Sequence, residues 1–112
     1  MSQIEQLTKE IIDFRNERDW EQFHNSKDLA IAISTEASEL LELFLWKENE
    51  DFNLDHLKDE LADVIICSLM LAHKHELNIS QIIRDKMAKN AKKYPVEKAK
   101  GNCKKYSEFS DT

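Results

Sequence analysis

Four acidic residues form two closely spaced pairs whose side chains could bind a metal ion. Glu36 and Glu39 stand three residues apart, and Glu60 and Asp63 repeat this spacing further along the chain. Residues three apart share one face of an α-helix, and both pairs are set into otherwise apolar stretches. Four carboxylates that converge on one core must take up protons or bind cations, because burying an uncompensated charge is costly. The pattern therefore predicts a metal site with all four carboxylates as ligands.

The ligand set favours a hard divalent cation. Carboxylate oxygens without histidine select Mg²⁺, with Mn²⁺ as a possible substitute, over Zn²⁺. A di-metal carboxylate protein of the iron type is an alternative, but such bundles normally add a Glu-x-x-His motif, which this sequence lacks. Solvated helix faces that bind no metal are another alternative, because a single pair of acids at this spacing is common.

A basic segment follows the acidic one. Between residues 84 and 105 there are nine Lys and Arg but only two acids. Lys86, Asn90 and Lys93 lie along one helix face, followed by Tyr94, and such a face could hold phosphate oxygens during phosphoryl transfer. A solvated lysine face and a nucleic-acid patch are the alternatives. The formal net charge of −6 for the whole chain argues against nucleic acid as a partner.

Aromatic residues near the acidic pairs could stack on a nucleobase. Trp20 and His24 fall in a connector, and Trp46 closes the helix that carries the first acidic pair. Stacking of an aromatic side chain on a base contributes about 1 to 3 kcal/mol. Packing in a core or an interface is the other use of the two tryptophans, and both uses can hold together.

Four helices are expected to position these residues. Apolar residues at positions 4, 7, 11 and 14 predict the first helix, over residues 3–18. The other helices are expected over residues 27–47, 54–75 and 79–93, with N-caps at Asn25 or Ser26, at Asn53, and at Asn78 or Ser80. The last helix stops before Pro95, because proline disfavours helical geometry in the residue before it.

The second and third of these helices are apolar nearly all round. On the second, Leu29 and Ile33 lie on one side, whereas Ile31 and Leu41 lie well away from it. A single layer of four helices cannot cover two such helices on every face. We therefore predict an all-α antiparallel bundle of four main helices, assembled as a homo-oligomer, a dimer or a tetramer, with these two helices at its centre. A monomer with an unusually buried core is the alternative.

The composition indicates one soluble domain over residues 1–112. A single glycine and a single proline exclude hairpin-rich sheets and Gly-rich nucleotide loops. No apolar run approaches the roughly 20 residues of a membrane span, and the N-terminus lacks the apolar core of a signal peptide. We expect a cytoplasmic protein without a membrane partner, whose residues from about 101 to 112 form a loose basic tail.

In their order, these motifs resemble the all-α nucleotide pyrophosphohydrolases of the MazG-like superfamily. The resemblance rests on the two acidic pairs followed by the segment KMAKNAKKYP, residues 86–95, and covers nearly the whole chain. The segments RDWEQFH at 18–24 and LFLWK at 43–47, together with Lys105 and Tyr106, are most similar to the dCTP pyrophosphatase branch. Two positions depart from that branch, which has a tyrosine in place of Cys67 and a histidine in place of Ile11.

The resemblance implies Mg²⁺-dependent hydrolysis of a nucleoside triphosphate to the monophosphate and pyrophosphate, as house-cleaning of the nucleotide pool. The implied metal ligands are Glu36, Glu39, Glu60 and Asp63, the implied base-pocket residues are Trp20, His24 and Trp46, and the implied phosphate-side residues are Lys86, Asn90, Lys93 and Tyr94. The substrate is expected to be dCTP or another, modified dNTP, and one of the first two carboxylates is expected to orient and deprotonate the attacking water. The alternative is a non-catalytic helical oligomerisation or regulatory module.

Overall fold

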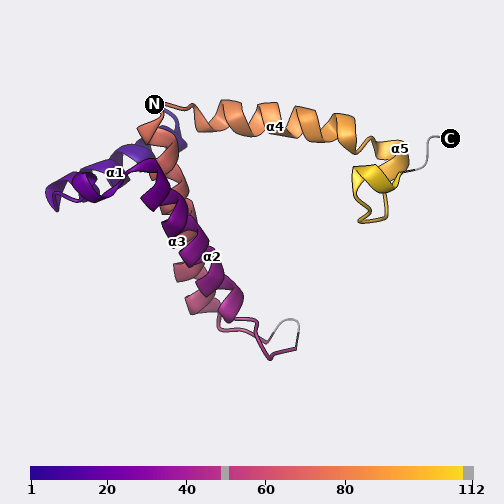
Figure 1. Cartoon of the computed structure of the whole chain (residues 1–112), viewed down its shortest axis with the longest axis horizontal. Helices are drawn as coiled ribbons and strands as arrows, with labels where there is room; N and C mark the ends of the chain where they lie inside the picture. The colour runs from indigo at the N-terminus through magenta and orange to yellow at the C-terminus, as the bar shows by residue number, and fades with distance from the viewer. Residues whose placement is uncertain (49–50, 110–112) are drawn as a thin grey trace. The chain divides into compact units, whose positions relative to one another are not determined.

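The computed structural model describes residues 1–48 and 51–109, and every regular element in them is helical (Figure 1). Two compact units divide the chain, Met1–Leu77 and Asn78–Thr112. The first contains α1 (Gln3–Glu17), the short 3₁₀ turn η1 (Glu21–Phe23), α2 (Ser26–Glu42) and α3 (Leu54–Lys74); the second contains α4 (Ile79–Lys93), α5 (Val96–Ala99) and η2 (Tyr106–Glu108). The predicted all-α class is confirmed. None of the helices in the described residues has the length and apolar character that a membrane crossing requires.

Asparagine side chains begin three of the four long helices. Asn25, Asn53 and Asn78 each accept a hydrogen bond from the backbone N–H three residues on, at 2.8, 3.0 and 3.0 Å. Each bond satisfies an N–H group that the first turn of a helix leaves unpaired. The predicted N-caps are thus confirmed, and α1, α3 and α4 match their predicted ranges to within one residue.

The second helix ends five residues earlier than predicted. Its last residue is Glu42, and Leu43 is the C-cap. From Leu43 onward the backbone bonds run three residues back, as between the Phe44 N–H and the Leu41 oxygen at 3.0 Å, and Trp46 adopts a left-handed φ of 63°. A left-handed residue cannot continue a right-handed helix. The prediction of a helix to residue 47, closed by Trp46, is therefore wrong: the leucine-rich composition favoured helix, but the tighter turn prevails.

The first helix ends in a Schellman turn. Asp19, the residue after the C-cap, has a φ of 55°, and the Trp20 N–H bonds back to the Arg15 oxygen at 3.2 Å. These bonds satisfy carbonyl groups at the helix end and fix the direction in which the chain leaves it. The third helix ends in the same way at Glu76, which also has a φ of 55°. Trp20 is thereby held next to the last turn of α1.

The core of the first unit is small. Helices α2 and α3 lie side by side, and α1 packs against α3 (Figure 1). Leu29 of α2 is 1% exposed and packs with Ile12 of α1 and Met70 of α3. Full burial of a side chain of this size stabilises the fold by about 1.5 to 3 kcal/mol. These three residues join all three helices of the unit.

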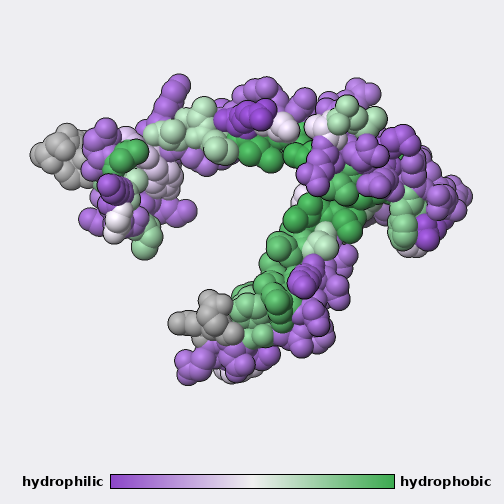
Figure 2. All heavy atoms as spheres, turned by 180° about the vertical axis from the view of Figure 1, so that it is seen from behind, coloured by the Kyte–Doolittle hydropathy of each residue, from purple (hydrophilic) through white to green (hydrophobic). Residues whose placement is uncertain are grey.

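Large apolar side chains remain exposed along α2 and α3. Figure 2 shows a band of hydrophobic residues running along this helix pair. The exposed members on the two helices are Ile31, Leu41, Leu54, Leu61 and Ile65. Extended apolar surface on a protein of this size is typical of an interface. It agrees with the predicted homo-oligomer, which stays a prediction, as do the four-helix bundle arrangement and the single domain over residues 1–112.

The second unit continues past α4 into a folded turn. Gly101, with a φ of 83°, reverses the chain, and η2 follows it. Tyr106 and Phe109 then meet the ring of Tyr94 edge to face, with centroid distances of 6.1 and 5.8 Å. The prediction of a loose tail over residues 101–112 did not anticipate these contacts, because edge-to-face packing of distant rings leaves no periodic pattern in the sequence. Residues 110–112 of that predicted tail lie outside the described residues.

Candidate functional site

Three of the four predicted carboxylates meet where α2 and α3 lie side by side. Glu36 comes from α2, and Glu60 and Asp63 come from successive turns of α3. One carboxylate oxygen from each of the three lies within 4.8 Å of the other two. We call these three residues the carboxylate cluster. It could offer three oxygen ligands to a single cation, whereas the spacing of the acidic pairs predicted four.

Glu39 adjoins the carboxylate cluster without belonging to its tightest group. Its side chain is half-buried and lies within hydrogen-bonding reach of both Glu36 and Glu60. It is not among the residues whose oxygens all lie within 4.8 Å of one another. All four predicted ligands are thus near one another, with Glu39 to one side.

The crowding of negative charge raises the pKa of two of these groups. Burial, the adjacent carboxyl group of Glu39 and the negative charges of Asp63 and Glu60 raise the pKa of Glu36 to about 7. Burial, the adjacent carboxyl group of Glu39 and the charges of Asp63 and Asp59 also raise the pKa of Glu60. A bound cation would offset this repulsion and favour the ionised forms.

Two carboxylate oxygens of the cluster lack a hydrogen-bond partner within residues 1–48 and 51–109. Oε2 of Glu36 and Oε2 of Glu60 are buried and accept no hydrogen bond from any described residue. An unsatisfied buried oxygen of this kind is costly unless a proton or a cation meets it. Because the cluster consists of carboxylates alone, its chemistry fits a hard cation such as Mg²⁺ or Mn²⁺.

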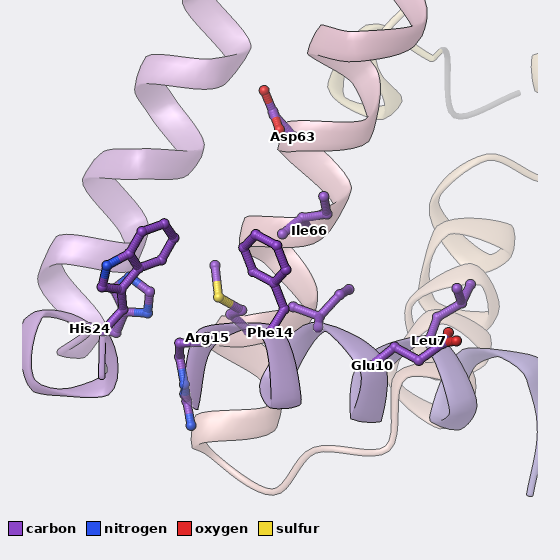
Figure 3. Close-up of a pocket in the computed structure, with 10 residues that line it drawn as sticks. Leu7, Glu10, Phe14, Arg15, His24, Asp63 and Ile66 are labelled. Carbon is purple, nitrogen blue, oxygen red and sulfur yellow. The ribbon is translucent and has the colours of Figure 1, made fainter. Parts of the chain in front are cut away.

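A pocket of about 460 Å³ adjoins the carboxylate cluster and shares Asp63 with it (Figure 3). Its lining residues are Leu7, Glu10, Ile11, Phe14 and Arg15 of α1, Trp20 and His24 of the connector, and Asp63, Ile66 and Met70 of α3. In Figure 3 the Phe14 ring rises from α1, and Asp63 stands above Ile66 on α3, nearer the N-terminus of that helix. The lining is mainly apolar, and the volume falls in the range of small-molecule sites. The pocket could hold a flat ring beside the cluster.

Trp20 and His24, two of the predicted base-contacting residues, both line this pocket. The Trp20 ring meets Phe14 edge to face at a centroid distance of 6.0 Å. His24 follows η1, and its buried Nδ1 has no hydrogen-bond partner among the described residues. Aromatic faces together with one free hydrogen-bonding atom suit a heteroaromatic ligand. The structure thus brings together two of the three predicted residues.

The third predicted base-contacting residue, Trp46, lies elsewhere. It stands in the turn after α2, is 101% exposed and does not line the pocket. Its predicted contact with a base stays a prediction.

The predicted phosphate-side residues lie in the second unit. Lys86, Asn90 and Lys93 are exposed on α4 and share one face of it, and the half-buried Tyr94 is its C-cap. Their predicted contact with phosphates stays a prediction.

Sequence reasoning missed Arg15 as a pocket residue. Its side chain is 7% exposed, donates two hydrogen bonds to Asn16 Oδ1 at 3.2 and 3.0 Å, and lies 3.9 Å from Glu21. Arginine is polar, so it falls outside a search for apolar stripes. The signal that could have found it is its position four residues after Ile11, on the buried face of α1.

Comparisons with known proteins identify relatives of this chain. A family model described as the MazG-like family matches residues 31–109, which include both acidic pairs and the α4 segment. A dCTP pyrophosphatase 1 from Bos taurus is 34% identical over 114 residues, covering 95% of this chain and 68% of that protein. The Homo sapiens protein of the same name is 33% identical, with 95% and 67% covered. A pyrophosphatase structure from Archaeoglobus fulgidus matches with a TM-score of 0.79 and 35% identity, over 85% of this chain and 94% of that chain.

Proposed function

The chain belongs to the MazG-like family, and from this we propose that it is a metal-dependent nucleoside triphosphate pyrophosphatase. It converts a dNTP to the dNMP and pyrophosphate and so removes unwanted nucleotides from the pool. The observation that carries the proposal is the meeting of Glu36, Glu60 and Asp63 at the edge of a pocket large enough for a nucleoside. The curated relatives named dCTP pyrophosphatase 1 favour this function over a non-catalytic oligomerisation module.

The carboxylate cluster binds the metal ion. Glu36, Glu60 and Asp63 hold one divalent cation, Mg²⁺ or Mn²⁺, and Glu39 completes the predicted set of ligands. The unpaired Oε2 atoms of Glu36 and Glu60 support this assignment, since a cation would satisfy both. When bound, the cation neutralises negative charge on the triphosphate and on the departing pyrophosphate.

Glu39 is the better placed of the two proposed catalytic carboxylates, Glu36 and Glu39. Glu39 lies outside the tight group of oxygens to which Glu36 belongs, and we therefore assign to Glu39 the role of accepting a proton from water. That water attacks the α-phosphorus, and its oxygen forms the new bond as the bond to the bridging oxygen breaks. The electron pair of the broken bond leaves with pyrophosphate. Glu36, a member of the carboxylate cluster, is the alternative general base.

The pocket beside the cluster binds the base. Trp20 and Phe14 offer ring faces and edges, and His24 Nδ1 offers a hydrogen bond. Ile11 lines the pocket with an apolar side chain, so fewer polar groups are available to read the base than a histidine at this position would give. The names of the relatives favour dCTP as the substrate, and the apolar Ile11 leaves room for another or a modified dNTP.

The exposed faces of α4 and of the pair α2 and α3 bind the phosphates and a second copy of the chain, respectively. Lys86, Asn90, Lys93 and Tyr94 bind phosphate oxygens, because α4 places its lysines on one exposed face. A homo-oligomer, a dimer or a tetramer, buries the exposed apolar side chains of α2 and α3.

The enzyme works in the cytoplasm, where free nucleotides occur and where the unpaired thiols of Cys67 and Cys103 stay reduced.

Incubation with each dNTP and NTP in the presence of Mg²⁺, followed by separation of pyrophosphate from orthophosphate, tests the proposed function. The expected products are a nucleoside monophosphate and pyrophosphate, with dCTP or a related dNTP among the best substrates. Release of orthophosphate, or no turnover of any nucleotide, contradicts the proposal.

Two substitutions separate the proposed roles within the site. Glu39→Gln should abolish turnover but keep most of the Mg²⁺-induced rise in melting temperature, whereas Asp63→Asn should lose both. Glu42→Gln is a matched control, because Glu42 is exposed on α2 outside the carboxylate cluster. Near wild-type turnover in Glu39→Gln or in Asp63→Asn rules out the assigned role of that residue.

A further inference from the structure

The ammonium group of Lys93 lies over an aromatic ring from the C-terminal turn, residues 105–109. Its Nζ is 4.8 Å from the ring centroid of Tyr106. A cation at this distance from a ring face is attracted by the negative charge of the π system. Lys93 itself is exposed and forms no salt bridge with any described residue. The ring of Tyr106 is thus the group that restrains this ammonium among the residues that the structure describes.

The kind of contact matters for what Lys93 can bind. A carboxylate partner would neutralise the ammonium and compete with an anionic ligand, whereas a ring face restrains the ammonium and leaves its charge in place. A lysine side chain also loses rotamer freedom when it binds a ligand, and a restraint present beforehand reduces that cost. The contact therefore favours anion binding by Lys93.

Tyr106 is itself held in place by the C-terminal turn. The Glu108 N–H donates to the Lys105 oxygen at 2.8 Å, and the Lys105 N–H donates to Glu108 Oε2 at 3.2 Å. The Tyr106 ring packs edge to face on Tyr94 with an interplanar angle of 89°. Tyr94 also packs against Phe109, so the turn is fixed on the end of α4 from two sides.

We propose that Tyr106 is a positioning residue, which holds the ammonium of Lys93 ready for the phosphate oxygens of the substrate. This inference rests on the proposed function, in which the exposed face of α4 binds phosphates. It makes the C-terminal turn a part of the phosphate-binding apparatus. Tyr106 acts through Lys93 and needs no contact with the nucleotide of its own.

The contact can first be tested in the free protein. NMR should show the ε-protons of Lys93 shifted upfield by the ring current in the wild type and in Tyr106→Phe, which keeps the ring. The shift should vanish in Tyr106→Leu. Phe109→Leu is the matched control, because it loosens the packing on Tyr94 but leaves the ring beside Lys93, and it should keep the shift. An identical signal in the wild type and Tyr106→Leu overturns the proposal.

Binding of inorganic tripolyphosphate with Mg²⁺, measured by calorimetry, then tests the consequence. Tyr106→Leu should weaken binding about two- to fivefold, the usual strength of an exposed cation–π contact, and Tyr106→Phe should restore it. In a Lys93→Gln background Tyr106→Leu should have no further effect. An equal loss in both backgrounds, or a Tyr106→Phe variant as weak as Tyr106→Leu, overturns the proposal.

Turnover provides the last readout. With dCTP, KM should rise by the same two- to fivefold in Tyr106→Leu while kcat stays within twofold of the wild type. A fall in kcat with an unchanged KM contradicts a positioning role. If the wild type hydrolyses no nucleotide, the proposed function fails, whereas the NMR and tripolyphosphate results still decide the role of Tyr106.

Discussion

Replacing one carboxylate of the cluster should stabilise the metal-free protein while destroying its response to Mg²⁺. We consider Glu36→Gln, which removes a negative charge and keeps the shape of the side chain. In the folded protein, burial and neighbouring carboxylates raise the pKa of Glu36 from 4.5 to about 7. Folding therefore favours the protonated form, and ionisation of Glu36 destabilises the fold. The amide never ionises and escapes this penalty.

The size of the stability change caused by Glu36→Gln, and its pH dependence, follow from the raised pKa of Glu36. A rise from 4.5 to about 7 corresponds to about 3 kcal/mol, at about 1.4 kcal/mol for each tenfold change in proton affinity. Glu36 as a residue is only half-buried, and screening by nearby solvent reduces the expected effect to about 1 to 2 kcal/mol. The stabilising contribution of the proton is fully present below pH 4.5 and is lost as the pH rises through about 7. Metal-free wild type should thus lose stability between about pH 5 and 8.

Thermal unfolding with a chelator, from pH 5 to 8, measures this effect. At pH 8 Glu36→Gln should melt about 3 to 8 °C above the wild type, and the two should converge at pH 5. Mg²⁺ at ten times its dissociation constant should stabilise the wild type by about 1.4 kcal/mol and Glu36→Gln by far less. The difference between the melting temperatures of Glu36→Gln and the wild type should therefore shrink or change sign when Mg²⁺ is added.

Glu42→Gln is the control for general charge removal, since it takes one acid from the exposed side of the same helix. It should change the metal-free melting temperature little and keep the full response to Mg²⁺. The reasoning is refuted if metal-free Glu36→Gln is less stable than the wild type at pH 8, or if it gains as much from Mg²⁺.

Three further predictions concern the pocket, the core and a helix end. Trp20→Ala should raise KM for dCTP about 5- to 100-fold with little change in kcat, because stacking on a base contributes about 1 to 3 kcal/mol; an unchanged KM would exclude Trp20 from the base pocket. Leu29→Ala should lower the free energy of unfolding in urea by about 2 to 5 kcal/mol, because Leu29 is 1% exposed between Ile12 and Met70; a loss below about 1 kcal/mol would show that this site is not the core. Glu76→Gly should raise the free energy of unfolding in urea by up to about 1 kcal/mol, because glycine adopts the φ of 55° without strain; a clear destabilisation would contradict the assigned turn.

Local rules made much of the fold predictable from the sequence. The caps at Asn25, Asn53 and Asn78 act within four residues, so the sequence alone specifies where those helices begin. The acidic pairs were found in the same way, because residues three apart share a helix face and two such helices were expected to be neighbours. The meeting of three carboxylates follows from those two facts.

The features that sequence reasoning missed depend on contacts between distant residues or on competing local structures. Helix α2 ends at Glu42 because a tight turn competes with leucine-rich helix propensity over residues 43–47. The pocket combines α1, the connector and α3, and only the packed structure shows that Arg15 lines it with His24. The contact of Lys93 with Tyr106 likewise joins residues on either side of a reversed chain.

Counting bound Mn²⁺ by electron paramagnetic resonance tests most directly whether the carboxylate cluster is a metal site. The wild type and Glu42→Gln should bind Mn²⁺ tightly and with equal stoichiometry, and Mg²⁺ should displace it. Asp63→Asn should bind little or none at the same concentrations. Equal Mn²⁺ binding by all three proteins would contradict the assignment of Glu36, Glu60 and Asp63 as the metal-binding residues.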